Sequence, residues 1–148
     1  MTAPGWKRIL IHHSAGHDRP GLDLPSIRAQ HRAQGWRDVG YHFVVEEVDG
    51  ATVALMGRPL SWEGSHCPGQ NKIAVGVCLV GDFTKAPPSP ALLGEAARLV
   101  SGLCAALRIP VSEIHPHREF KATACPGDSF PFEQFRGLVL AELEAAGG

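Results

Sequence analysis

Hydrophobic side chains alternate in a way that predicts two interior strands. In residues 7–13, Leu10 points to one face while Ile9 and Ile11 point to the other, so both faces carry apolar side chains. Residues 73–81 form a second, nearly continuous apolar run. Strands with two apolar faces are covered on both sides, so we expect both segments inside a sheet.

Two further apolar segments flank a turn signal. Residues 41–48 and 51–56 are apolar or alternating, and Asp49-Gly50 between them is typical of a two-residue hairpin turn. We therefore expect these segments to pair as antiparallel neighbours. Residues 111–114 are expected to add one more short strand.

Helical spacing is clearest after Ser89, which can cap a helix that begins with Pro90. The apolar residues that follow recur every three or four positions: Leu92, Ala96, Leu99, Val100, Leu103 and Leu107. Residues 25–34 predict a short helix stopped by Gly35, and residues 132–146 predict a last amphipathic helix. Together these elements predict an α/β fold, with a central mixed β-sheet flanked by helices.

The remaining segments lack periodicity and predict loops. Residues 16–24 and 57–72 are rich in glycine, proline and polar residues, and the segment between His117 and Cys125 shows no apolar repeat. Loops on a rigid sheet are where binding and catalytic residues concentrate. The length of 148 residues, without internal repeats, predicts a single domain over residues 1–148.

Composition and charge narrow the function classes. The formal net charge of −1 gives no electrostatic reason to expect nucleic acid or a membrane surface as a partner. Four cysteines are too few for a disulfide scaffold at this length, so we expect reduced thiols. The sequence has no recognisable signal peptide or bilayer-length apolar run, so we expect synthesis in the cytoplasm and access to any external target after release or export. We also expect a monomer.

The strongest candidate for chemistry is a possible metal site. His117 and Cys125 lie eight residues apart, and His12 ends the apolar run of the first predicted strand. Two imidazoles and a thiolate that leave a fourth position open are typical of a catalytic zinc site, whereas structural sites close the tetrahedron with protein ligands. From the pair alone, a buried cysteine and an unrelated surface histidine are an equally good interpretation.

Four segments that follow one another along the chain favour the metal site over an unrelated cysteine and histidine. They are residues 9–14 (ILIHHS), 35–43 (GWRDVGYHF), 75–83 (VGVCLVGDF) and 117–127 (HREFKATACPG). As a set they resemble the zinc-dependent N-acetylmuramoyl-L-alanine amidases, which include peptidoglycan recognition proteins and amidase-type phage lysozymes. The resemblance extends from about residue 9 to the last helix, and it implies a central mixed sheet with the metal at the floor of a groove.

Carried over residue by residue, the resemblance implies that His12, His117 and Cys125 bind zinc and that Tyr41 lies beside the metal. Thr123 falls on a further active-site position of the family. Many phage members have lysine there, so this chain is similar to the recognition proteins at that position and lacks a cation that could help the transition state. The related cytoplasmic recycling amidases are similar but have an aspartate at the position of the cysteine ligand.

Such a site has a physical rationale. Zinc would lower the pKa of a bound water from near 16 toward roughly 7 and polarise an amide carbonyl. Tyr41 is the only tyrosine, and with an ordinary pKa near 10 it is a poor base, so we expect it to hydrogen-bond to the water or to the developing oxyanion. A strand aromatic that packs in the core is the alternative for this residue.

The remaining candidates concern substrate binding. In the predicted loop of residues 57–72, Trp62, His66 and Asn71 are expected to contact substrate. For His66, an ordinary loop position is an equally good interpretation. His13 should face away from the metal because it neighbours His12 on a strand. His115 could support a ligand from outside the metal's first shell or simply be exposed.

The resemblance implies hydrolysis of the amide bond between N-acetylmuramic acid and L-alanine in peptidoglycan, as in a phage or prophage endolysin. Two alternatives stay open. The domain could bind peptidoglycan without catalysis, as family members that have lost a ligand do. It could also be an amidase with a nucleophilic cysteine, Cys78 or Cys67, which requires a thiolate activated by its surroundings.

Overall fold

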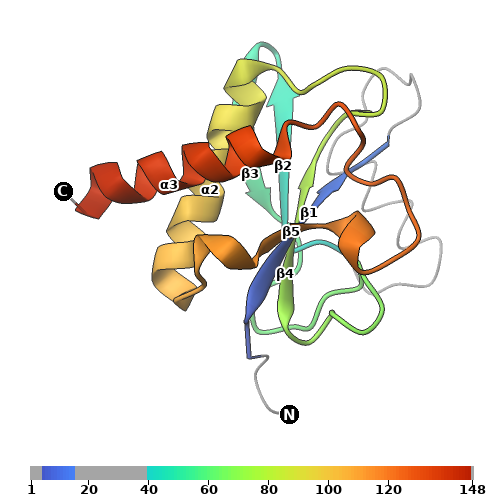
Figure 1. The fold of residues 1–148 in the computed structure, drawn as a ribbon, viewed down its shortest axis with the longest axis vertical. Helices are drawn as coiled ribbons and strands as arrows, with labels where there is room; N and C mark the ends of the chain where they lie inside the picture. The colour runs from blue at the N-terminus through green and yellow to red at the C-terminus, as the bar shows by residue number, and fades with distance from the viewer. Residues whose placement is uncertain (1–4, 16–39, 148) are drawn as a thin grey trace.

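A computed structural model describes residues 5–15 and 40–147 of the chain (Figure 1). The predicted loop over residues 16–24 and the predicted helix over residues 25–34 lie outside the described residues.

The centre of the described structure is a five-stranded mixed sheet in the order β3-β2-β4-β1-β5. Its strands are β1 (Arg8–His13), β2 (Phe43–Val48), β3 (Ala51–Met56), β4 (Ala74–Leu79) and β5 (Ile114–Pro116). β1 pairs in parallel with both β4 and β5, β2 is parallel to β4, and β2 and β3 form the predicted antiparallel hairpin. The mixed sheet expected from the apolar pattern is therefore confirmed.

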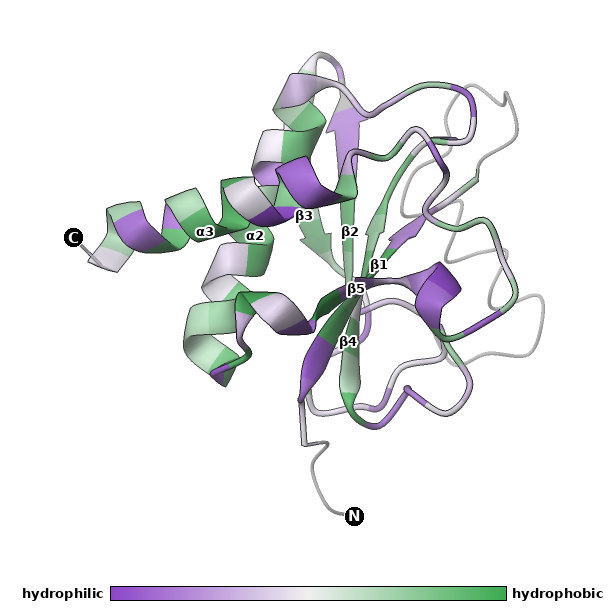
Figure 2. Cartoon of the chain, viewed as in Figure 1, coloured by the Kyte–Doolittle hydropathy of each residue, from purple (hydrophilic) through white to green (hydrophobic). Residues whose placement is uncertain are grey.

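Two helices cover one face of this sheet (Figure 1). α2 (Pro90–Leu107) and α3 (Phe132–Gly147) share one apolar cluster with the β1 residues Ile9 and Ile11. Figure 2 shows the hydrophobic residues along α2 and the central strands that build this core. α2 is long and apolar enough to span a bilayer by length and composition, a property that core helices share.

The predicted cap of α2 is present, because the Ser89 hydroxyl accepts a hydrogen bond from the backbone N–H of Leu92 at 3.1 Å. The helix ends at Arg108, which takes the left-handed conformation. The opposite face of the sheet is also covered, since Leu10 packs there against Cys67 and Ala74. β1 is therefore an interior strand with two buried faces, as its sequence predicts.

One strand prediction and one loop prediction need correction. The strand predicted over residues 111–114 begins only at its last residue, since β5 starts at Ile114. Val111–Glu113 form a 3-10 turn instead, closed by a hydrogen bond from the Glu113 N–H to the Pro110 carbonyl. Within residues 57–72, His66 and Cys67 are buried, so this segment is not simply a surface loop. It folds under the sheet because its side chains cover the apolar face that the helices leave open.

The parallel pairing places one set of strand ends together. β1, β4 and β5 all run in the same direction, so their carboxyl ends meet at one edge of the sheet. In sheets of this type, ligands bind beside the carboxyl ends of the strands. The candidate site lies at this edge.

Candidate metal centre and active site

His12 is supplied by β1, one residue before the strand ends. It is paired with Cys78 of β4 and lies on the sheet face opposite the two helices. The residue is only 1% exposed. A regular interior strand therefore holds this imidazole in a fixed position, which suits a ligand that must be preorganised.

His117 follows directly after β5, where a short 3-10 turn (His117–Glu119) begins. Because β5 runs parallel to β1, the chain delivers this ring next to His12, with the two ring centroids 4.3 Å apart. Both ring nitrogens of His117 are buried and have no hydrogen-bond partner among the described residues. Buried polar atoms without a partner are uncommon, and a metal ion would satisfy one of them.

Cys125 lies in the loop that connects this turn to α3. The Thr123 hydroxyl accepts a hydrogen bond from the Cys125 backbone N–H at 3.3 Å, and the Cys125 carbonyl accepts one from the N–H of Arg118 at 3.0 Å. The Cys125 sulfur accepts a bond from the backbone N–H of His13 at 3.3 Å. Local turn bonds and the end of β1 together aim the thiol at the other two side chains.

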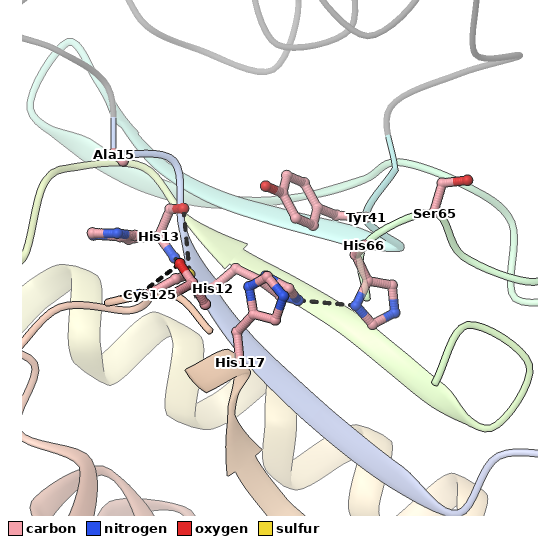
Figure 3. Close-up of a pocket in the computed structure, with 9 residues that line it drawn as sticks. His12, His13, Ala15, Tyr41, Ser65, His66, His117 and Cys125 are labelled. Atoms are coloured by element: carbon pink, nitrogen blue, oxygen red, sulfur yellow. Dashed lines mark hydrogen bonds between the residues drawn. The ribbon is translucent and has the colours of Figure 1, made fainter. Parts of the chain in front are cut away.

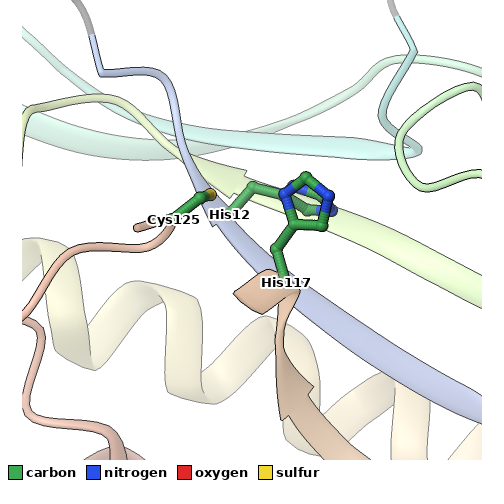
Figure 4. Close-up of side chains that lie close together, drawn as sticks. All are labelled: His12, His117 and Cys125. Carbon is green, nitrogen blue, oxygen red and sulfur yellow. The ribbon is translucent and has the colours of Figure 1, made fainter. Parts of the chain in front are cut away.

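The three side chains converge, as Figure 4 shows. One ligand atom from each of His12, His117 and Cys125 lies within 4.8 Å of the others, a group that could hold a metal ion. Two imidazoles and a sulfur fit zinc by donor type, and three protein ligands leave a coordination position for solvent or substrate. The expectation that these distant residues meet is confirmed; their role as ligands stays a prediction.

A cavity of about 260 Å³ opens over the cluster (Figure 3). Its lining includes the three candidate ligands together with Tyr41, His66 and Thr123. Sequence reasoning missed two further lining residues, Ala15 and Ser65, which carry no recognisable chemical signal on their own.

Burial sets the protonation states around the cluster. Burial lowers the pKa of His12 well below its ordinary value, with further lowering by His66 and His117. Burial also lowers the pKa of His117 and raises that of Cys125 to about 11, although the N–H of His13 acts in the opposite direction on the thiol. Both imidazoles are therefore neutral near pH 7 and ready to bind a metal, whereas the thiol must lose its proton.

Comparison with known proteins agrees with this geometry. The sequence profile of the N-acetylmuramoyl-L-alanine amidase family matches residues 2–128. The chain belongs to this family. The endolysin of Enterobacteria phage K11 is 35% identical over 139 residues, which cover 92% of this chain and 87% of the endolysin.

Solved structures place the amidase in the same group. The N-acetylmuramoyl-L-alanine amidase LysC from Clostridium intestinale superposes with a TM-score of 0.80 at 29% identity, covering 90% of this chain and 84% of LysC. A Drosophila PGRP-LB structure in complex with tracheal cytotoxin gives a TM-score of 0.73 at 28% identity, covering 89% and 80% of the two chains. The fold is therefore that of the peptidoglycan recognition protein-like amidases, and the chain is an amidase enzyme.

Tyr41 of the amidase lies beside the cluster, two residues before β2 begins. Its ring centroid is 5.0 Å from that of His12, and its hydroxyl hydrogen-bonds to the thiol of Cys78. Burial raises the pKa of Tyr41 well above its ordinary value, and Cys78 raises it further. This tyrosine is suited to donate a hydrogen bond from a neutral hydroxyl.

The predicted substrate-binding residues have different surroundings. Asn71 uses its side-chain oxygen to accept bonds from the backbone N–H groups of His66 and Cys67, both at 2.9 Å. His66 lines the cavity but has both ring nitrogens engaged. Among the described residues, the lining of this cavity does not include Trp62, whose carbonyl accepts a bond from His42. The substrate contacts of these residues stay predictions.

The other histidines of the described structure have structural partners. The ring of His13 points away from the cluster, as expected, and its Nδ1 accepts a bond from the N–H of Phe83 at 3.1 Å (Figure 3). His115 lies 2.8 Å from a carboxylate oxygen of Glu119 and 3.2 Å from one of Glu113.

The two cysteines considered as nucleophiles are poorly suited to that role. Cys78 and Cys67 are both buried, and burial raises the pKa of each thiol. All four cysteines of the described structure are free thiols, as predicted. A nucleophilic cysteine needs the opposite effect, a pKa lowered by a neighbouring cation or base.

Proposed function

We propose that this amidase hydrolyses the amide bond between N-acetylmuramic acid and L-alanine in peptidoglycan, with zinc held by His12, His117 and Cys125. The arrangement of these three side chains supports the proposal. The three donors lie within 4.8 Å of one another under an open cavity, and both buried nitrogens of His117 lack a partner among the described residues.

A zinc ion bound there would supply Lewis-acid activation of the amide carbonyl and of the attacking water. The chain's own residues prepare this chemistry. His12 and His117 stay neutral because of their burial, and the backbone N–H of His13 stabilises the thiolate form of Cys125. The neutral hydroxyl of Tyr41 can donate a hydrogen bond to the oxygen that gains negative charge.

Peptidoglycan as substrate is supported by the relatives. One is a phage endolysin, and PGRP-LB was solved with tracheal cytotoxin bound. The cavity over the cluster offers room for part of a muramyl peptide. In this proposal Thr123 occupies the active-site wall, Trp62 and Asn71 belong to the substrate-binding surface, and the enzyme reaches the cell wall as an endolysin does, after release or export.

The test is digestion of purified peptidoglycan followed by identification of the new end groups. We expect new amino groups on L-alanine and no new reducing sugar ends. A chelator should abolish the reaction, and added zinc should restore it. New sugar ends, or full activity in the chelated protein, would refute the proposal.

A peptidoglycan-binding domain without catalysis is the remaining alternative. In that case the protein would sediment with purified cell walls but release no new ends, with or without zinc. The complete set of candidate ligands and the adjacent Tyr41 favour the enzyme. The Cys125→Ala variant serves as the matched control, since it should keep the fold and wall binding but lose zinc and activity.

A further inference from the structure

The ring of His66 occupies a space that two glycines leave open. A Cβ on Gly76 of β4 would lie 2.7 Å from Cγ of this ring, and one on Gly64 would lie 2.9 Å from its Nε2. Real Cβ atoms essentially never approach other atoms so closely, so larger residues at these positions would displace the ring. His66 as a whole is only 8% exposed. The fold therefore builds a specific slot for an imidazole directly behind the candidate metal ligand.

Hydrogen bonds fix the ring in this slot. Nε2 of His66 lies 2.9 Å from the backbone carbonyl of Ala74, and Nδ1 lies 2.9 Å from Nε2 of His12 (Figure 3). The two rings are nearly perpendicular, with an interplanar angle of 86°. The side-chain oxygen of Asn71 accepts a hydrogen bond from the backbone N–H of His66 and so holds the loop in place.

The direction of each bond follows from what each atom can do. A carbonyl oxygen only accepts, so Nε2 of His66 must carry the hydrogen, and the neutral ring then has an unprotonated Nδ1. That atom can only accept, so Nε2 of His12 is the donor. The remaining nitrogen of His12, Nδ1, is then left with a free lone pair, which is the form that a metal requires.

We propose that His66 is a positioning residue that selects the tautomer of His12, so that Nδ1 of His12 is the atom offered to the metal. The chain of bonds runs from the Ala74 carbonyl through both imidazoles. This inference rests on the proposed function for its consequence in catalysis, but the tautomer exists without metal. It also gives His66 a role other than the substrate contact predicted from the sequence.

The tautomer can be read directly in the zinc-free protein labelled with 15N. We expect the ring nitrogen shifts of His12 to show a protonated Nε2 and an unprotonated Nδ1. A coupling across the hydrogen bond between Nε2 of His12 and Nδ1 of His66 should be visible. A protonated Nδ1 on His12 in the folded wild-type protein would overturn the inference.

Three variants separate the two hydrogen bonds of His66. His66→Asn keeps an acceptor near the position of Nδ1, so it can still receive the bond from His12. His66→Gln keeps a donor toward the Ala74 carbonyl but loses that acceptor, and His66→Phe removes both. We expect zinc affinity, measured by competition with a chelator, to fall about 10- to 100-fold in His66→Phe and His66→Gln, as for other lost partners of ligating histidines.

His66→Asn should stay within several-fold of wild type, because it preserves the acceptor. A purely structural role would instead lower the free energy of unfolding in all three variants without this ordering of affinities. Equal zinc affinity in wild type and His66→Phe would overturn the inference and leave the proposed function intact. If the wild-type protein bound no zinc, the proposed function would fail, and with it the role assigned to His66.

Discussion

The backbone N–H of His13 donates a hydrogen bond to the sulfur of Cys125 across 112 positions of sequence, at 3.3 Å. The neighbouring residue His12 points its ring into the cavity, while the ring of His13 binds the N–H of Phe83 on the other side of the strand. The end of β1 thus supplies a candidate ligand and stabilises a second one. This explains how a single strand can organise most of the site before any metal binds.

Zinc binding should release about one proton per ion near pH 7. The zinc-free Cys125 has a pKa of about 11 and must be deprotonated, whereas His12 and His117 are already neutral because burial lowers their pKa values. Calorimetry in buffers of different ionisation enthalpy measures this number. The thiol and a zinc-bound water can together supply at most two protons. Release of three protons would therefore show that an imidazole is charged in the zinc-free protein, contrary to this account.

Gly127→Ala should weaken zinc binding, although this residue has no donor atom for a metal. Gly127 has a φ of +100°, and a Cβ there would overlap the backbone of Phe83 and lie 2.5 Å from the N of Thr84. The loop that carries Cys125 would have to move, at a cost of about 1–3 kcal/mol in the free energy of unfolding.

Gly102→Ala is the matched control for this change. Gly102 lies within α2, and a Cβ there would meet nothing within 4 Å. This variant should raise the free energy of unfolding by roughly 0.5–1 kcal/mol and leave zinc affinity unchanged. Urea denaturation and chelator competition on both variants check the pair. Unaltered zinc affinity in Gly127→Ala would mean that the loop position does not control the site.

Much of this architecture can be predicted from the sequence because its signals are local. The apolar alternation of residues 7–13 identifies β1, and Ser89-Pro90 identifies the start of α2. The convergence of His12 with His117 depends on parallel pairing between β1 and β5, which periodicity does not encode. It could be expected only from the resemblance of several motifs taken together.

The role of His66 could not be found in this way. A histidine in an irregular segment gives no signal of burial, and its contact with His12 depends on the register of β4, which places Gly76 beneath the ring. The position of β5 was missed for a similar reason. Its pairing with β1 begins only at Ile114. Residues 111–113 close a turn although their composition weakly favours a strand, because strand formation depends on pairing partners that the local sequence does not reveal.

Acid should destabilise the zinc-free protein through His42. Its Nδ1 accepts a bond from the N–H of Gly76, and burial lowers its pKa from 6.5 to about 4. The unfolded state therefore binds a proton first as the pH falls. The contribution of His42 to stability is complete above pH 6.5 and is lost as the pH decreases towards 4, by roughly 3 kcal/mol at most.

His42→Asn tests this prediction, because asparagine keeps an acceptor for Gly76 but does not titrate. The free energy of unfolding, measured by urea denaturation between pH 7 and about 4, should decline less steeply in this variant than in wild type. Equal slopes in the two proteins would show that His42 does not carry the effect. Both proteins should be zinc-free, since loss of metal in acid would add a separate dependence.

Tyr41→Phe should separate catalysis from metal binding. The ring stays 5.0 Å from His12 and fills the same space, so zinc affinity should remain within about twofold of wild type. Loss of the hydroxyl removes a donor aimed at developing negative charge, for which losses of about 10²–10³ in kcat are typical. Turnover of solubilised muramyl peptides and chelator competition give the two readouts. Full turnover in Tyr41→Phe would show that the hydroxyl does not assist catalysis and that its role is limited to the hydrogen bond with Cys78.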